Sequence, residues 1–250
     1  MAGTLYIVAT PIGNLGDFSP RAQETLAQAD FIAAEDTRVS LKLLNHFGIR
    51  KPLVSYHEHN QACAGQAILQ RLLAGESCAL VTDAGTPAVS DPGEGLVRLC
   101  ALEGVPVIAI PGCCAAVNAL AVSGLPTGRF CFEGFLPMNK KERRERLAAL
   151  QTEERTMLFH EAPHKLRSTL SDLRDAFGPD RRLSLCRELT KLHEETLRLT
   201  LGEAVAYYGT AEPKGEFVLV LEGAPQRERS EVSLEAAAAM VYRSVGPKPL

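Results

Sequence analysis

The sequence contains no tryptophan and no long apolar run, and its net charge is close to zero. A helix that spans a bilayer needs roughly 20 consecutive apolar residues, and no segment of the 250 residues provides them. The first four residues lack the basic and apolar regions of a signal peptide. The net charge of −3 excludes a globally basic nucleic-acid binder, although it allows a local basic face. We therefore expect a cytoplasmic protein with no membrane partner.

The seven cysteines form neither a metal-binding pattern nor a disulfide framework. No two of them are separated by two residues, no histidine stands at metal-ligand spacing, and Cys113 and Cys114 are adjacent. We expect reduced thiols and no metal site. The sequence also lacks the G-x-G-x-x-G and G-x-x-x-x-G-K-[ST] patterns, which argues against Rossmann dehydrogenases and P-loop nucleotidases.

Short apolar runs alternate with helical patterns along residues 1–110. This alternation predicts a parallel sheet with right-handed crossovers. Both faces of such a sheet are covered, and its strands are therefore continuously apolar. The predicted strands are 5–9, 31–34, 53–56, 78–82 and 105–110, and the predicted helices are 20–29, 40–47, 62–74 and 93–102.

A second α/β unit is predicted after the segment 123–128, which is rich in glycine and proline. We expect an N-terminal domain over 1–122, a C-terminal domain with a mixed sheet over 123–224, and a short linker with a C-terminal helix over 225–250. The predicted strands of the second domain are 130–132, 156–160, 183–186 and 217–222, its predicted helices are about 139–151, 163–176 and 202–208, and the last predicted helix is 234–245.

Three turns rich in glycine and proline follow predicted strands of the first sheet. They cover residues 10–17, 82–93 and 110–116. The carboxyl ends of parallel strands meet at one edge of the sheet, where ligands of open α/β folds bind. Glycine lets the backbone approach a ligand closely, and the second turn is longer than a simple connection requires. These turns predict a site for an adenosine-like ligand, whereas each turn alone is also compatible with a structural role.

Polar residues also follow several strands. In the first half these are the segments 35–38 and 57–60, for which a role in a catalytic or RNA-facing cleft competes with surface capping. Metal binding by His57 and His59 is a weaker alternative, because no partner ligands stand out. In the second half, mixed charge stands directly after the strands that end near residues 160 and 186. These side chains offer acid–base and phosphate-binding groups, or form ordinary ion pairs. The candidates are Glu161, His164, Arg187, Glu188 and Lys191.

Basic residues gather in the second half of the chain. Residues 1–110 hold 7 basic and 11 acidic side chains, whereas residues 138–182 hold 11 basic and 8 acidic ones. Five of the seven residues in segment 140–146 are basic. Such a helix suits the phosphate backbone of RNA, and a solvated helix face is the alternative.

Six motifs in fixed order resemble one family. They are Val-Ala-Thr-Pro-Ile-Gly-Asn at 8–14, Asp-Ala-Gly-Thr-Pro-Ala-Val-Ser-Asp-Pro-Gly at 83–93, Ile-Pro-Gly at 110–112, Glu-Gly-Phe-Leu-Pro at 133–137, Glu-Ala-Pro-His at 161–164 and Arg-Glu-Leu-Thr-Lys at 187–191. Over about residues 4–223 the chain is similar to the ribosomal RNA small subunit methyltransferase I family, the cytidine 2′-O-methyltransferase branch of the tetrapyrrole methylase superfamily.

The resemblance implies a two-domain α/β fold with S-adenosyl-L-methionine in the cleft between the domains. It also implies a homodimer that methylates the ribose of a cytidine in the decoding region of the 16S rRNA, as free rRNA or within the 30S particle. Carried over by motif, the implied cofactor contacts are Ile12, Gly85, Thr86, Val89, Ser90, Cys113, Cys114 and Ala115 in the first domain and His160, Leu189 and Glu216 in the second.

Transfer of a methyl group to a ribose hydroxyl requires alignment of donor and acceptor and removal of a proton. The predicted catalytic residues are Glu161, Arg187, Glu188 and Lys191, and Asp36 and His57 are further candidates for the base. Two other functions stay open. The first is a methyltransferase of the same superfamily with a small tetrapyrrole-like acceptor. The second is a non-catalytic RNA scaffold that binds an adenosyl ligand.

Overall fold

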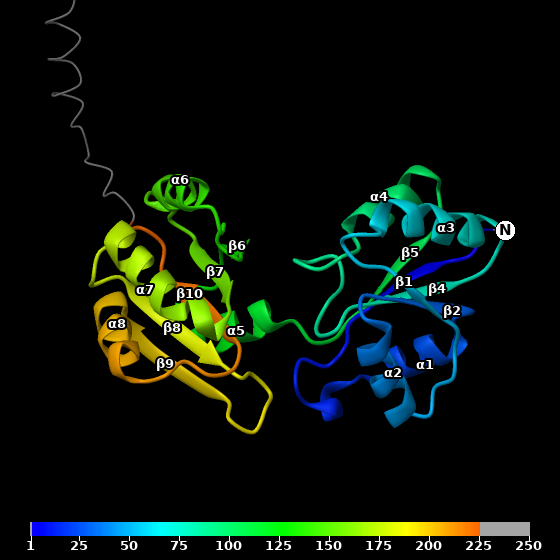
Figure 1. Cartoon of the computed structure of the whole chain (residues 1–250), viewed down its shortest axis with the longest axis horizontal. Helices are drawn as coiled ribbons and strands as arrows, with labels where there is room; N and C mark the ends of the chain where they lie inside the picture. The colour runs from blue at the N-terminus through cyan, green and yellow to red at the C-terminus, as the bar shows by residue number, and fades with distance from the viewer. Residues whose placement is uncertain (1, 226–250) are drawn as a thin grey trace, which may run out of the picture.

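The computed structural model describes residues 2–225 and contains two separate five-stranded sheets (Figure 1). The first sheet has the order β3-β2-β4-β1-β5, and every strand pair in it is parallel. Its strands are β1 (Leu5–Val8), β2 (Phe31–Ala34), β3 (Leu53–Ser55), β4 (Cys78–Val81) and β5 (Val107–Ile110). This arrangement confirms the parallel sheet that the alternating pattern predicts.

Helices cover both faces of the first sheet (Figure 1). One apolar cluster joins Phe31 and Leu80 to side chains of α3 and α4, and another joins Ile32 and Val81 to side chains of α1 and α2. Neighbouring residues of a strand thus supply opposite clusters, which explains why these strands are apolar throughout. The elements are η1 (Leu15–Asp17), α1 (Pro20–Gln28), α2 (Thr37–His46), α3 (Gln61–Leu73) and α4 (Glu94–Leu102).

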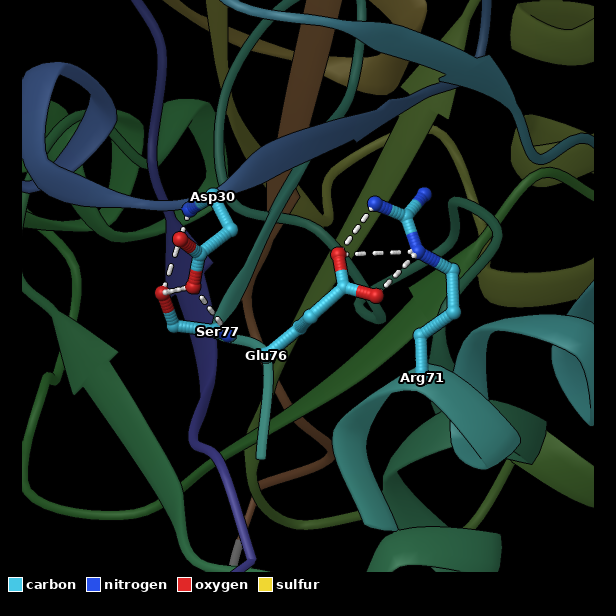
Figure 2. Close-up of polar contacts among 4 residues, drawn as sticks. All are labelled: Asp30, Arg71, Glu76 and Ser77. Atoms are coloured by element: carbon cyan, nitrogen blue, oxygen red, sulfur yellow. Dashed lines mark hydrogen bonds and ion pairs between the residues drawn. The ribbon is translucent and has the colours of Figure 1, made fainter. Parts of the chain in front are cut away.

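Polar contacts hold the amino ends of β2 and β4 together (Figure 2). The Asp30 carboxylate accepts hydrogen bonds of 2.7 Å from the amide and the hydroxyl of Ser77, and these bonds lower the pKa of Asp30. Arg71 donates hydrogen bonds to Glu76 and lies over the ring of Phe31 at 3.4 Å. These side chains fix the end of the sheet where the strands begin. The predicted ligand turns lie at the opposite end, where the strands finish.

The second sheet is mixed, with the order β6-β7-β10-β8-β9. Only β6 and β7 pair in parallel, and the remaining pairs are antiparallel. The predicted fold class, α/β with a parallel and a mixed sheet, is therefore confirmed. The strands are β6 (Phe130–Gly134), β7 (Thr156–Glu161), β8 (Arg182–Arg187), β9 (Glu195–Thr200) and β10 (Phe217–Leu221).

Three helices pack on one face of the second sheet, and α5 packs on its other face. These are α6 (Lys140–Leu150), α7 (Pro163–Phe177) and α8 (Leu201–Thr210), opposite α5 (Ala115–Ser123). In Figure 1, α5 lies between the two sheets. The predicted boundary after residue 122 falls at the end of α5, although α5 shares its apolar cluster with the second sheet. The division into domains stays a prediction.

The predicted helix 234–245 lies outside the described residues. Within residues 2–225, no helix is both long and apolar enough to cross a membrane.

Candidate functional site

The three predicted turns lie side by side at the carboxyl ends of β4, β1 and β5, which are neighbours in the sheet. Thr10 and Gly85 exchange backbone hydrogen bonds of 2.9 and 3.1 Å, which ties the first turn to the second. The Thr86 hydroxyl donates a hydrogen bond of 2.9 Å to the carbonyl oxygen of Cys113, which ties the second turn to the third. The three turns therefore form one continuous backbone surface.

The second turn has an unusual backbone. Gly85 has a φ of +88°, and Ala88 and Ser90 have φ values of +66° and +67°. Residues other than glycine rarely adopt a positive φ, and strain of this kind gathers at functional sites because the surrounding contacts must hold it. The backbone strain of this turn exceeds what a simple connection from β4 to α4 requires, which makes the turn a candidate functional element.

The loop between β8 and β9 carries a charged network. It lies where the turns of the first sheet meet the second sheet, a place that we call the junction. The ammonium group of Lys191 donates hydrogen bonds of 2.8 Å to the carboxylates of Glu188 and Glu216. The amide of Glu216 also donates to Glu188 at 2.9 Å. Glu188 and Thr190 have positive φ values of +52° and +66°, so this loop resembles the second turn in its strain.

The network fixes the charges of its members. The hydrogen bond from Lys191 lowers the pKa of Glu188, although burial opposes this shift. Burial disfavours the charge of Lys191, but the hydrogen bonds to Glu188 and Glu216 outweigh it and raise the pKa of Lys191. Lys191 is therefore a cation at neutral pH, held in place by two carboxylates.

Lys191 also reaches the first turn. A Cβ atom added to Gly13 would lie 2.3 Å from Cγ of Lys191, so the lysine side chain passes directly over the backbone of that glycine. An apolar cluster makes a second contact between the halves, since Ile12 packs in the same cluster as Leu189 and Val218 of the second sheet. The loop after β8 and the turn after β1 are thus in contact.

His160 and Thr190 each have a buried polar atom without a hydrogen-bond partner in the described structure. These atoms are Nε2 of His160 and Oγ1 of Thr190. The rings of Phe132 and Phe135 lie against the imidazole at centroid distances of 5.1 and 5.5 Å. Burial lowers the pKa of His160, and the charge of Glu216 partly opposes this effect. Ser40 and His57 also have such an atom, so it is the position of His160 and Thr190 near Glu216 and Lys191 that makes them candidates for a ligand contact.

The structure thus gathers most of the predicted cofactor residues around this junction. Gly85 lies beside Ile12 and Cys113, Thr86 bonds to Cys113, and Cys114 and Ala115 share the apolar cluster with Ile12 and Leu189. A Cβ atom added to Gly134 of β6 would lie 3.2 Å from Oγ of Ser90. Val89 is exposed, and Glu216 belongs to the network of Lys191.

Two of the predicted catalytic residues face elsewhere. Glu161 is 5% exposed, and its carboxylate accepts hydrogen bonds from the hydroxyl of Thr169 on α7 and, at 2.8 Å, from the amide of Ala162. Arg187 donates a hydrogen bond of 3.1 Å to Glu195 on β9. Neither side chain joins the network of Glu188 and Lys191. The catalytic roles of Glu161 and Arg187 therefore stay predictions, and Arg187 acts on Glu188 only through its charge.

An acidic cluster at the carboxyl ends of β2 and β4 was not predicted as a unit. The Thr82 hydroxyl donates to Glu35 at 2.5 Å, and the Asp36 amide donates to Asp83 at 3.1 Å. Burial raises the pKa of Asp91 to about 6, and the charges of Glu35 and Asp83 add to this effect. Asp83 and Asp91 belong to the second turn, but Glu35 lies far from them in the sequence. The sequence therefore gave no signal for the raised pKa of Asp91.

Within the segments 35–38 and 57–60, local hydrogen bonds add to these contacts. Hydrogen bonds from Arg38 lower the pKa of Asp36 to about 2. The side chain of Asn60 accepts a hydrogen bond of 2.8 Å from the amide of His57. Among residues 2–225, no three His, Cys, Asp or Glu side chains are arranged to hold a metal ion.

A parallel sheet and a mixed sheet, with a turn of the first in contact with a loop of the second, define the class of this protein as a two-sheet α/β protein with its candidate site where the sheets meet. A model of the family described as tetrapyrrole (corrin/porphyrin) methylases matches residues 4–205. Ribosomal RNA small subunit methyltransferase I of Synechocystis sp. is 52% identical over 93% of this chain and 84% of its own length. The protein of the same name from Halalkalibacterium halodurans is 53% identical over 92% of this chain and 79% of its own length.

The chain belongs to the tetrapyrrole methylase family and, within it, to the family of ribosomal RNA small subunit methyltransferase I. The resemblance given by the six motifs is thus confirmed. At the level of the family, the prediction of a methyltransferase is confirmed as well.

Solved structures agree on the fold. Diphthine synthase superimposes with a TM-score of 0.66 at 15% identity and covers 88% of this chain and 90% of its own. A Thermus thermophilus uroporphyrin-III C-methyltransferase in complex with S-adenosylhomocysteine superimposes with a TM-score of 0.59 at 21% identity. It covers 88% of this chain and 97% of its own. At these identities the likeness concerns the fold alone.

Proposed function

We propose that this protein transfers a methyl group from S-adenosyl-L-methionine to the 2′-hydroxyl of a cytidine in the decoding region of small-subunit rRNA. The relatives named as small subunit rRNA methyltransferases support the rRNA substrate and the methyl transfer. One observation carries the assignment of the site: Lys191 lies over Gly13 of the first turn, and hydrogen bonds join that turn to the second and the second to the third. The homodimer and the cytoplasmic location belong to the same proposal.

The residues at the junction fit an adenosyl cofactor. Gly85 is buried between Ile12 and Cys113, and Ile12 and Leu189 supply apolar side chains against which the ring system of the cofactor packs in this proposal. The unpartnered polar atoms of His160 and Thr190 offer hydrogen bonds at the second sheet. When bound, S-adenosyl-L-methionine supplies an electrophilic methyl group on a sulfonium.

The reaction forms a bond from the ribose oxygen to the methyl carbon and breaks the bond from that carbon to sulfur, while the hydroxyl proton leaves. Lys191 stays charged, so it stabilises the negative charge that develops on the ribose oxygen. Glu188, whose pKa is lowered, holds the ammonium group in position. Glu216 is 78% exposed and hydrogen-bonded to Lys191, so its carboxylate offers an acceptor that passes the proton to water.

Radiolabelled methyl transfer to small ribosomal subunits tests this proposal. A ribose without a free 2′-hydroxyl cannot assist cleavage of its own phosphodiester, so 2′-O-methylation leaves the label in an alkali-stable dinucleotide. Methylation of a base leaves the label in mononucleotides. We expect the label in an alkali-stable dinucleotide that begins with cytidine. Label in mononucleotides contradicts the 2′-O assignment, and no transfer contradicts the enzyme.

The variant Lys191→Met tests the role of the network. We expect a fall in the single-turnover rate on the order of 10²-fold with cofactor affinity nearly unchanged, because the amine acts mainly in the transition state. Lys42→Met removes the same charge from an exposed position on α2 and serves as the matched control. Equal rates for the two variants contradict the proposed role of Lys191.

Two other functions make different predictions. A methylase that acts on a small tetrapyrrole-like acceptor would transfer label to that acceptor and none to ribosomal particles. A non-catalytic RNA scaffold would bind the cofactor and RNA but transfer no label. The similarity to relatives named as small subunit rRNA methyltransferases favours rRNA over both alternatives.

A further inference from the structure

We propose that the groove between α6 and α7 binds the RNA strand that flanks the target nucleotide, with its phosphates on Lys140, Arg144 and Lys165. The groove has a volume of about 730 Å³ and contains none of the predicted cofactor or catalytic residues. This inference rests on the proposed function, because it names the surface that holds the RNA substrate outside the site of transfer.

The charges in the groove are not balanced. Four basic side chains line it, and one of them, Arg143, pairs with Asp172 at 2.6 Å. The other lining carboxylate, Asp175, pairs with Arg174 at 2.8 Å. The three remaining cations have no carboxylate partner within residues 2–225. Lys165 donates a hydrogen bond of 2.7 Å to the sulfur of Met138, which leaves its charge uncompensated. Cations without a carboxylate partner along a groove are what a phosphate backbone requires.

The groove begins next to the junction. Helix α6 follows the segment of Gly134 and Phe135, and Gly134 lies against Ser90 of the second turn. Phe135 packs against His160, and α7 begins directly after the strand that carries this histidine. Lys140 and Lys165 lie near the starts of the two helices, so they mark the end of the groove that is nearer the junction. In this proposal, a strand whose target nucleotide lies at the junction enters the groove at the end marked by Lys140 and Lys165.

Apolar surface accompanies the cations. Met138 is 75% exposed and lines the groove, and Phe135, which precedes the groove in the chain, is 58% exposed. Leu147 and Ala148 contribute further apolar lining. Single-stranded RNA is bound through bases that stack on aromatic and apolar side chains while phosphates pair with cations. Helix α6 is about 16 Å long, which suits a short single-stranded segment.

This assignment also explains why only part of the basic helix faces RNA. Arg143 is committed to Asp172 and Thr169, and Arg146 is paired with Glu133. Lys141 lies outside the groove, with Glu145 at 4.0 Å. The sequence pattern of five basic residues in seven positions thus contains two groove cations, and Lys165 of α7 supplies the third.

The test compares two triple variants with the same change in net charge. Lys140→Gln, Arg144→Gln and Lys165→Gln remove the groove cations, and Lys141→Gln, Arg21→Gln and Arg98→Gln remove three exposed cations outside the groove. The probe is a fluorescent single-stranded fragment of small-subunit rRNA, titrated at several salt concentrations. The measured quantity is the slope of the logarithm of the RNA binding constant against the logarithm of the salt concentration. In the groove variant we expect this slope to become smaller in magnitude by roughly two, about 0.7 for each of the three lost phosphate contacts. The control variant should keep the slope of the unmodified protein.

Two further measurements separate this inference from the proposed function. Cofactor titration should give the same affinity for both variants, and the single-turnover rate at saturating RNA should be unchanged. If the unmodified protein transfers methyl groups and the groove variant keeps its salt slope, the groove does not bind RNA. If the unmodified protein transfers no methyl group, the proposed function fails first. Displacement of the RNA by polyglutamate as readily as by polycytidylate would assign the groove to acidic peptides and overturn the proposal.

Discussion

The substitution Gly85→Ala tests the cofactor site with a single added methyl group. The φ of +88° lies in the region that costs an L-residue about 1–2 kcal/mol. The added Cβ would lie 3.5 Å from Cγ2 of Ile12 and 3.9 Å from the carbonyl oxygen of Cys113, which are ordinary contacts. The methyl group therefore strains the backbone but collides with nothing inside the protein, and it occupies the space between the first and third turns.

Two effects of different size are expected from this change. The free energy of unfolding should fall by about 1–2 kcal/mol because of the backbone strain. If S-adenosyl-L-methionine packs between Ile12 and Cys113, the methyl group overpacks the complex at a further cost of about 1–3 kcal/mol. The dissociation constant should then rise roughly 5- to 150-fold.

Gly104→Ala provides the matched control. Gly104 has a φ of +69°, and a Cβ atom there would have no neighbour within 4 Å. It lies before β5, at the edge of the sheet opposite to the turns. Urea unfolding should show a similar loss of stability in both variants, whereas calorimetric titration should show weaker cofactor binding only in Gly85→Ala. Equal dissociation constants in the two variants would place the cofactor elsewhere.

Three further outcomes are expected. Because burial raises the pKa of Asp91 from 3.8 to about 6, the folded state binds this proton more tightly than the unfolded chain, and stability is lost as the pH rises through this range. Asp91→Asn should therefore be more stable than the unmodified protein by roughly 1–2 kcal/mol at pH 7, discounted for partial exposure, and no more stable at pH 4 in urea unfolding. Arg143→Ala should lower the free energy of unfolding by about 1–3 kcal/mol, since the 15% exposed guanidinium bonds to Asp172, and an unchanged urea midpoint would contradict this. A thiol reagent should modify exposed Cys63 in the native protein but reach Cys78, whose pKa burial raises to about 12, only after unfolding.

The first sheet, and the turns at the carboxyl ends of its strands, were predictable because each signal for them is local in the sequence. Continuous apolar runs mark β1, β2, β4 and β5, and glycine and proline mark the turns that follow three of these strands. The parallel order then brings the turns together without further information. The sequence pattern also located the basic helix, although not which of its side chains are neutralised by residues of α7 and β6.

Strand β9 was missed because it lacks an apolar signal. Its residues Glu195–Thr200 alternate polar with apolar side chains, and it forms the edge of the second sheet, where charged side chains are common. The omission had a consequence for the site. Glu195 of this strand is the partner of Arg187, so the sequence did not indicate the contact that holds this predicted catalytic residue.

The contact between Lys191 and the first turn illustrates a different limit. Gly13 and Lys191 lie in separate halves of the chain, and each belongs to a motif that the sequence made visible. Their contact depends on how the two sheets are placed relative to each other, which no local pattern encodes. The pKa of Asp91 depends in the same way on Glu35, which β2 brings beside β4.

His160 and Glu161 show where elementary geometry refines the assignment. They are consecutive residues of β7, and consecutive side chains of a strand point to opposite faces of the sheet. His160 packs with Phe132, which belongs to the apolar cluster of α5 and Ile12, whereas Glu161 bonds to Thr169 of α7 on the other face. The two side chains cannot both face the junction, so a cofactor contact at His160 excludes a catalytic carboxylate at Glu161.

We therefore expect Glu161→Gln to alter stability through its bond to Thr169 and to leave the single-turnover rate of the folded enzyme unchanged, while His160→Ala weakens cofactor binding. If Glu161→Gln lowers the single-turnover rate and leaves the stability unchanged, Glu161 acts in catalysis, and the conclusion that only His160 serves the junction is wrong.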